Sequence, residues 1–111
     1  MRVFILEDDP EISSLERLVL SGAGYQVTLV DCSRALDPLA WSRAGVAVVD
    51  LSLPGVSGVD VLHMLRRELP QVWRVVASAV EWKLRPEDHE ADVILAKPFL
   101  IDELLAAVGG G

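Results

Sequence analysis

Four short apolar segments of the chain each end in residues that can do chemistry. VFIL is followed by three acids, VAVV by one acid, RVVA by a hydroxyl and VILA by a lysine, namely Glu7 to Asp9, Asp50, Ser78 and Lys97. The carboxyl ends of parallel strands meet at one edge of a sheet, so these side chains are expected to lie close together. Their order predicts a site that accepts a phosphoryl group on Asp50.

A carboxylate accepts a phosphoryl group only when the repulsion between the two anions is overcome, and a divalent cation achieves this. Glu7 and Asp8 can supply carboxylates for that cation. Mg²⁺, or Mn²⁺ in its place, suits such a site because it prefers oxygen ligands and keeps several waters. Lys97 adds a point charge toward the phosphoryl oxygens, and Ser78 can donate a hydrogen bond to one of them.

The elements that must position these residues follow a repeat of strand and helix. Short Val, Ile and Leu segments predict strands near residues 2–6, 26–30, 46–50, 73–77 and 93–96, with helices between them on both faces of the sheet. We therefore expect a single α/β domain of the doubly wound (βα)5 type. Its five-stranded parallel sheet is expected in the order 2-1-3-4-5.

Proline and glycine mark the helix ends. Asp9-Pro10 predicts the start of the first helix, which Gly22 and Gly24 should end, and Asp37-Pro38 predicts a short second helix that reaches about residue 43. A third helix is expected between Gly58 and Pro70. Its buried stripe is predicted to contain Val59, Leu62, Leu65 and Leu69.

The last third of the chain has a weaker helical pattern. Pro86 interrupts the polar segment after Ser78, so the fourth helix is predicted to be short or irregular. A brief last helix is expected over 100–108. The domain would then comprise residues 1–108, and Gly109 to Gly111 would form a flexible tail or the start of a linker.

Over residues 2 to about 108, the chain resembles the CheY-like receiver domain of bacterial two-component response regulators. The motifs that carry the resemblance are LEDD at 6–9, DLSLPGVSG at 50–58, Ser78-Ala79 and Lys97-Pro98-Phe99. The resemblance implies that Asp50 is the phosphoacceptor, Ser78 the switch hydroxyl and Lys97 the lysine of the site. It also implies that Mg²⁺ is bound by Asp8, Asp50 and the backbone carbonyl of Ser52, with Glu7 acting through water. Asp9 is then mainly a helix cap.

The implied partner is a sensor histidine kinase or a histidine phosphotransfer protein. The chain departs from the family at Ile94, where receivers usually carry Tyr or Phe, and Trp82 is a candidate substitute for that ring. The switch and interface residues are thus expected to be Ser78, Ala79, Ile94 and Trp82. A further hypothesis is a homodimer through an altered face made by the fourth helix, the fifth strand and the last helix.

The amino-acid composition argues against several other classes of protein. The formal charge of −7 argues against direct nucleic-acid binding, and no apolar segment approaches the ~20 residues that span a membrane. A single cysteine allows no disulfide within the chain, so the expected location is the cytoplasm.

Two other functions share parts of this sequence pattern. A pseudo-receiver would use the same fold as an interaction module without phosphorylation, and this alternative stays open. An aspartyl phosphohydrolase of the haloacid dehalogenase kind places an acid two residues after the nucleophile, where this chain has Ser52. We therefore expect a phosphoacceptor signalling domain rather than an enzyme.

Overall fold

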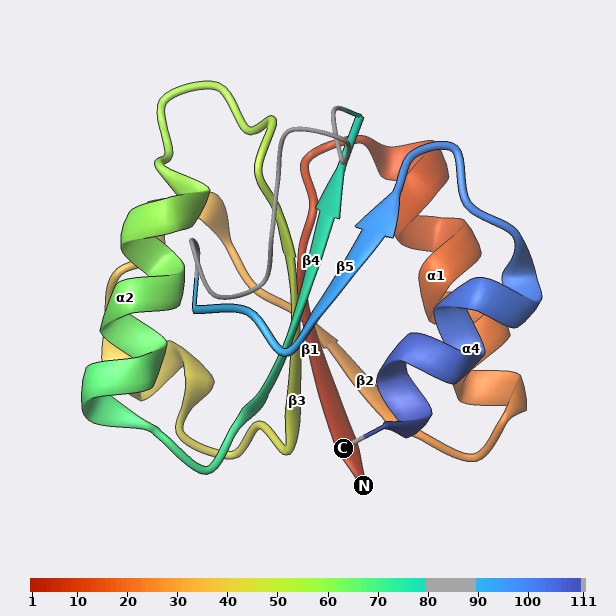
Figure 1. Cartoon of the computed structure of the whole chain (residues 1–111), viewed down its shortest axis with the longest axis horizontal. Coiled ribbons are helices and arrows are strands. Elements are labelled where there is room, and N and C mark those ends of the chain that lie inside the picture. Colours follow the sequence, from red (N-terminus) through yellow and green to blue (C-terminus); the bar gives the residue numbers. More distant parts are fainter. Residues whose placement is uncertain (80–89, 111) are drawn as a thin grey trace.

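A computed structural model of the chain describes residues 1–79 and 90–110. Five parallel strands form one sheet in the order β2-β1-β3-β4-β5 (Figure 1), which confirms the predicted fold class and topology. Each strand agrees with its predicted position to within one residue. The strands are β1 (Arg2–Leu6), β2 (Gln26–Leu29), β3 (Val46–Asp50), β4 (Trp73–Ser78) and β5 (Val93–Ala96).

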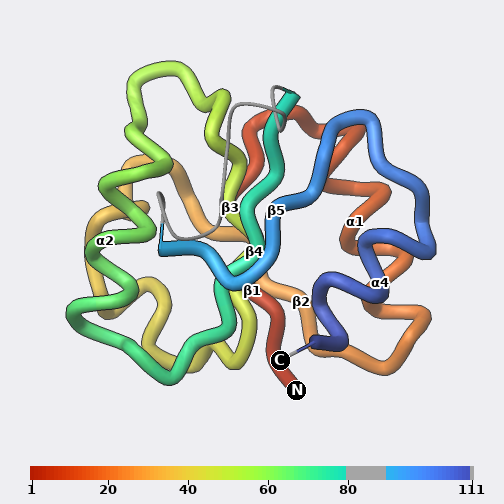
Figure 2. The backbone as a smooth tube through the Cα atoms, viewed as in Figure 1, coloured from red at the N-terminus to blue at the C-terminus, as the bar shows by residue number. Residues whose placement is uncertain are grey.

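Helices cover both faces of the sheet. On one face α1 (Pro10–Gly22) and α4 (Ile101–Gly109) lie side by side, as the tube view also shows (Figure 2). On the other face lies α2 (Gly58–Glu68), together with two short 3₁₀ turns, η1 (Cys32–Arg34) and η2 (Pro38–Trp41). The helix named α4 is the last element of the chain. The irregular helix expected near Pro86, and Trp82 with it, fall outside the described residues.

Two apolar clusters hold these layers together. The cluster under α1 and α4 contains Ile5, Val48, Leu95 and Leu20, and none of these side chains is more than 4% exposed. The three central strands are buried on both faces, as their continuous apolar sequences predict. The sheet therefore provides a rigid base for the residues that follow its carboxyl ends.

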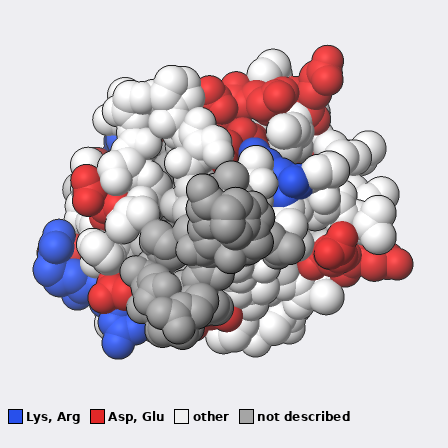
Figure 3. Space-filling model, turned by 45° about the horizontal axis from the view of Figure 1, so that its top comes forward, with Lys and Arg blue, Asp and Glu red and all other residues white. Residues whose placement is uncertain are grey.

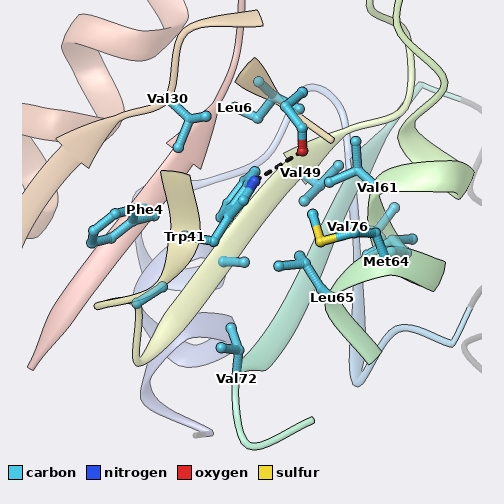
Figure 4. Packing of buried hydrophobic residues seen from close by; sticks show 14 of the residues in the cluster. Phe4, Leu6, Val30, Trp41, Val49, Val61, Met64, Leu65, Val72 and Val76 are labelled. Atoms are coloured by element: carbon cyan, nitrogen blue, oxygen red, sulfur yellow. Dashed lines mark hydrogen bonds between the residues drawn. The ribbon is translucent and has the colours of Figure 1, made fainter. Parts of the chain in front are cut away.

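The second cluster is centred on Trp41, which is fully buried between the sheet and α2 (Figure 4). Its Nε1–H donates a hydrogen bond of 2.9 Å to the carbonyl of Ala35, and its ring lies 6.5 Å from that of Phe4. The indole therefore packs η2 against the same face of the sheet as α2.

The prediction of a second helix that reaches about residue 43 was wrong. The chain instead forms η1 and η2, because Asp31 and Asp37 each cap a separate turn by accepting a backbone N–H two residues ahead. Such 3₁₀ turns rarely extend beyond three or four residues. The buried face of α2 also differs from its prediction, since Val61, Leu62, Met64 and Leu65 are buried whereas Val59 and Leu69 are only half-buried.

The ends of α1 agree with their predicted signals. Asp9 caps the helix by accepting the N–H of Glu11 at 2.9 Å, and Gly24 follows its end with φ of +96°, a conformation that favours glycine. The last helix begins and ends one residue later than predicted. Its start is set at Leu100, whose backbone N–H donates a hydrogen bond to the side chain of Glu103. Among the described residues, no helix is long and apolar enough to cross a membrane.

Candidate functional site

Strand alternation brings the three central residues of the candidate site to one face of the sheet. Glu7, Asp50 and Lys97 each follow, by two residues, a side chain of the cluster under α1 and α4: Ile5, Val48 and Leu95. Side chains two residues apart in a strand point to the same face. The three charged groups therefore converge beyond the last apolar layer, on the side that α1 covers.

Lys97 connects the two acids directly. Its Nζ lies 2.7 Å from Oε1 of Glu7 and 3.0 Å from Oδ2 of Asp50. The carboxylates are almost completely buried, with 2% and 3% of their side chains exposed, and the lysine side chain is 16% exposed. Buried charges are retained at acceptable cost when they are paired in this way.

The pairing alters the acidity of both partners. Burial raises the pKa of the Glu7 carboxyl, and the nearby Asp50 raises it further, although the hydrogen bond from Lys97 acts in the opposite direction. Burial alone would lower the pKa of Lys97, but its hydrogen bonds to Glu7 and Asp50 outweigh that effect and raise it. The lysine thus stays charged throughout the physiological range.

The loop after β3 holds the Asp50 carboxylate in place. The backbone N–H of Ser52 donates a 2.8 Å hydrogen bond to Oδ1 of Asp50, which leaves Oδ2 to Lys97. Gly58 allows the start of α2 to approach this loop, because a Cβ at that position would lie 2.7 Å from Cδ2 of Leu51 and 3.1 Å from the Asp50 carbonyl oxygen. The phosphoacceptor candidate is therefore fixed by backbone on one side and by a cation on the other.

A third carboxylate completes an acidic cluster. Oxygens of Glu7, Asp8 and Asp50 all lie within 4.8 Å of one another, and Asp8 is exposed to solvent. Figure 3 shows acidic side chains gathered at this edge of the molecule with a basic side chain beside them. Asp9 is separate from this cluster in role, since its carboxylate caps α1. The oxygen donors and the charge of the cluster fit a hard divalent cation.

The predicted switch residues surround the site at different depths. Ser78 is buried at the end of β4, and its carbonyl accepts the N–H of Lys97 at 2.8 Å. Ala79 is exposed, and Ile94 is half-buried on β5 opposite Val76. A mainly apolar pocket of about 390 Å³ opens beside the lysine, lined by Ile12, Leu15, Ala79, Lys97, Pro98 and Phe99.

One residue near the site was missed in the sequence. Glu16 lies on the inner face of α1 and is only 2% exposed, and the charges of Glu7, Lys97 and Asp50 all act on it. The available signal was its helical spacing, four residues after Ile12 and four before Leu20. An acid at that spacing occupies a position where the pattern calls for an apolar side chain.

Comparison with known proteins identifies the family. A model of the response regulator receiver domain matches residues 3–109. The chain belongs to the response regulator receiver domain family. Among curated relatives of this receiver, Response regulator MprA of Mycobacterium avium (strain 104) is 34% identical over 110 residues, which cover 96% of the chain and 48% of MprA. DNA-binding dual master transcriptional regulator RpaA of Synechocystis is also 34% identical, with 96% and 47% covered.

Solved receiver structures have the same fold. The Francisella response regulator 1452 receiver domain superposes with a TM-score of 0.84 at 28% identity, covering 97% of this chain and 93% of that one. TrrA from Thermotoga maritima, solved in complex with Mg(2+)-BeF, gives the same TM-score at 23% identity, covering 98% and 96%. The receiver spans about half the length of the curated relatives it matches.

Proposed function

We propose that this receiver accepts a phosphoryl group on Asp50 from a phosphohistidine of a sensor histidine kinase or a histidine phosphotransfer protein. The observation that carries the proposal is the buried Asp50 carboxylate, which Lys97 contacts at 3.0 Å and the Ser52 N–H at 2.8 Å. A carboxylate fixed on both sides is positioned for attack on phosphorus. Membership of the receiver family supports the same role.

In the transfer step, a carboxylate oxygen of Asp50 forms a bond to phosphorus while the bond between phosphorus and the histidine nitrogen breaks. The electron pair of that bond stays with the imidazole. Lys97 then offers its ammonium group to the phosphoryl oxygens, and the Ser78 hydroxyl donates to one of them. The domain acts as a phosphoacceptor in signalling, with self-catalysed transfer and hydrolysis only.

The acidic cluster supports a role for a divalent cation, Mg²⁺ or Mn²⁺. Three carboxylates against one ammonium group leave two negative charges, which a divalent ion balances. Asp8, Asp50 and the Ser52 carbonyl would hold the ion, and Glu7 would contribute through water. When bound, the ion neutralises charge on the phosphoryl oxygens.

The output is proposed to pass through Ser78 and Ala79 to a surface that includes Ile94 and Trp82. This surface would support a homodimer, formed by the segment before β5 together with β5 and α4, and would make no direct contact with nucleic acid. The receiver itself is proposed to comprise residues 1–108, with 109–111 leading into a tail or linker. The proposed location is the cytoplasm.

Phosphoryl transfer is tested by incubating the protein with Mg²⁺ and a small phosphodonor, followed by intact-mass measurement. Wild type is expected to gain the mass of one phosphoryl group, and Asp50→Asn none. Asp60→Asn, which alters an exposed acid in the first turn of α2, should behave as wild type. If wild type gains no mass, or if Asp50→Asn still does, Asp50 is not the phosphoacceptor and the pseudo-receiver alternative is favoured.

A further inference from the structure

Glu16 is a buried acid that the proposed transfer step does not use. It shares the inner face of α1 with Ser13 and Leu20, and that face packs on the side of the sheet to which Glu7, Asp50 and Lys97 point. Its exposure of 2% is similar to that of the apolar residues around it. A charged side chain is rarely placed there unless it is paired.

Glu16 is not paired in this way. Its Oε2 is the one buried side-chain oxygen or nitrogen without a hydrogen-bond partner in the described part of the chain. An ionised carboxylate in such surroundings is strongly disfavoured, so the group keeps its proton more readily than an exposed acid. Burial, with a further contribution from the charge of Glu7, raises the pKa of Glu16 to about 7, although Lys97 acts in the opposite direction.

The charged groups that act on Glu16 are those of the phosphoacceptor site. They come from three elements: Glu7 follows β1, Asp50 ends β3, and Lys97 follows β5. Within residues 1–79 and 90–110, no hydrogen bond or ion pair joins Glu16 to any of them. The acids at the start of α4, Asp102 and Glu103, are exposed instead. The influence between Glu16 and the site is therefore one of charge through a buried layer.

We infer that Glu16 is a positioning residue of the phosphoacceptor site, which controls through Lys97 how readily Asp50 takes up a phosphoryl group. A neutral Glu16 leaves the Lys97 ammonium to the phosphoryl oxygens. A charged Glu16 competes for that ammonium and repels the added negative charge, in a buried region where such interactions are strong. This inference rests on the proposed function of Asp50.

The first test measures beryllofluoride affinity in excess Mg²⁺ at pH 6 and pH 8 for wild type, Glu16→Gln and Glu16→Leu. Glutamine and leucine are neutral at both pH values and similar in size to glutamate. Both variants are expected to bind about tenfold more tightly than wild type at pH 8, and within about twofold of it at pH 6. Glu11→Gln, which changes an exposed acid of the same helix, should follow wild type at both pH values.

A ratio of wild-type to Glu16→Gln affinity that is the same at both pH values would overturn the inference. So would a loss of binding in Glu16→Leu but not in Glu16→Gln, because that result indicates a hydrogen bond rather than a charge. If wild type binds no better than Asp50→Asn at either pH, the proposed function fails.

A second measurement, which needs no phosphoryl analogue, then decides the inference. The shift in urea midpoint caused by Glu16→Gln at pH 8 is compared in wild type and in Lys97→Met, or Lys97→Gln if the methionine variant does not fold. We expect the shift to grow by about 0.5 M when the lysine is absent, because charged Glu16 has then lost the positive charge of Lys97 that acts on it. An equal shift in both backgrounds shows that Glu16 does not act through Lys97.

Discussion

The ammonium group of Lys97 lies 2.7 Å from Oε1 of Glu7, although 90 positions separate the two residues and their strands are not neighbours. Strands β3 and β4 lie between β1 and β5 in the sheet. The same ammonium also contacts Asp50 at the end of β3. One side chain therefore joins three strands at the edge where the proposed chemistry takes place.

Removal of this connection is expected to destabilise the protein. Lys97→Met leaves Glu7 and Asp50 buried without a cation, and breaking a buried pair of this kind costs about 3 kcal/mol of the free energy of unfolding. Urea unfolding at pH 7 measures the loss. Arg66→Met, at an exposed position of α2, should change stability by less than ~0.5 kcal/mol. Equal stabilities of the two variants would contradict this prediction.

The stability of the wild type should fall as pH rises from about 4.5 to about 7. Unfolding releases the Glu16 carboxyl from burial, so its pKa returns from about 7 to its usual value of 4.5, and the folded state binds the additional proton between these pH values. Glu16→Gln has no such proton. Its advantage in free energy of unfolding over wild type should therefore grow by about 3 kcal/mol between pH 4 and pH 8.

Urea titrations at pH 4, 6 and 8 measure that difference. Glu11→Gln is the matched control, because Glu11 is exposed on the same helix. A constant difference between wild type and Glu16→Gln at all three pH values would show that Glu16 does not retain its proton in the folded protein.

Gly58→Ala should disturb the loop that carries Asp50. The new Cβ would lie 2.7 Å from Cδ2 of Leu51 and 3.0 Å from its Cα, so α2 and the loop must separate. We expect a loss of about 1–3 kcal/mol in the free energy of unfolding, as for other overpacked sites, and weaker Mg²⁺ binding. Gly22→Ala meets no atom within 4 Å at the end of α1 and should not destabilise the protein. Similar losses in both variants would refute a steric cause.

Trp41→Phe tests the packing of η2 against the sheet. The change removes the 2.9 Å hydrogen bond to Ala35 and part of a fully buried ring, so a loss of about 2 kcal/mol or more is expected. Trp73→Phe removes a similar bond to Ala107, but Trp73 is only half-buried and should cost less. Thermal unfolding of both variants compares them directly, and a larger loss at Trp73 would count against the central role of Trp41.

The sequence was sufficient to predict the sheet because its strands are buried on both faces and are therefore almost continuously apolar. It also located the helix starts that depend on a single local signal, such as Asp9-Pro10. The segment between β2 and β3 was predicted wrongly, because whether two capped turns merge into a helix depends on how Trp41 packs, and packing is not local.

The sequence predicted that the side chains of the candidate site lie close together, but it did not predict which of them contact one another. Strand alternation places Glu7, Asp50 and Lys97 together whatever their spacing along the chain. The choice of Glu7 as a partner of Lys97 depends on side-chain conformations that no spacing rule fixes. Glu16 was missed because an acid on α1 is usually assigned to the solvent face, and only the packed helix shows that it points inward.

The position of Lys97 between Glu7 and Asp50 has a consequence for how this receiver could diverge. A descendant that no longer exchanged phosphate would still need the lysine, because two buried acids depend on it for their charge balance. Loss of the signalling role would therefore have to begin at the acids, and only neutral replacements there would make the lysine dispensable. The order of substitutions along such a lineage is constrained by folding as well as by signalling.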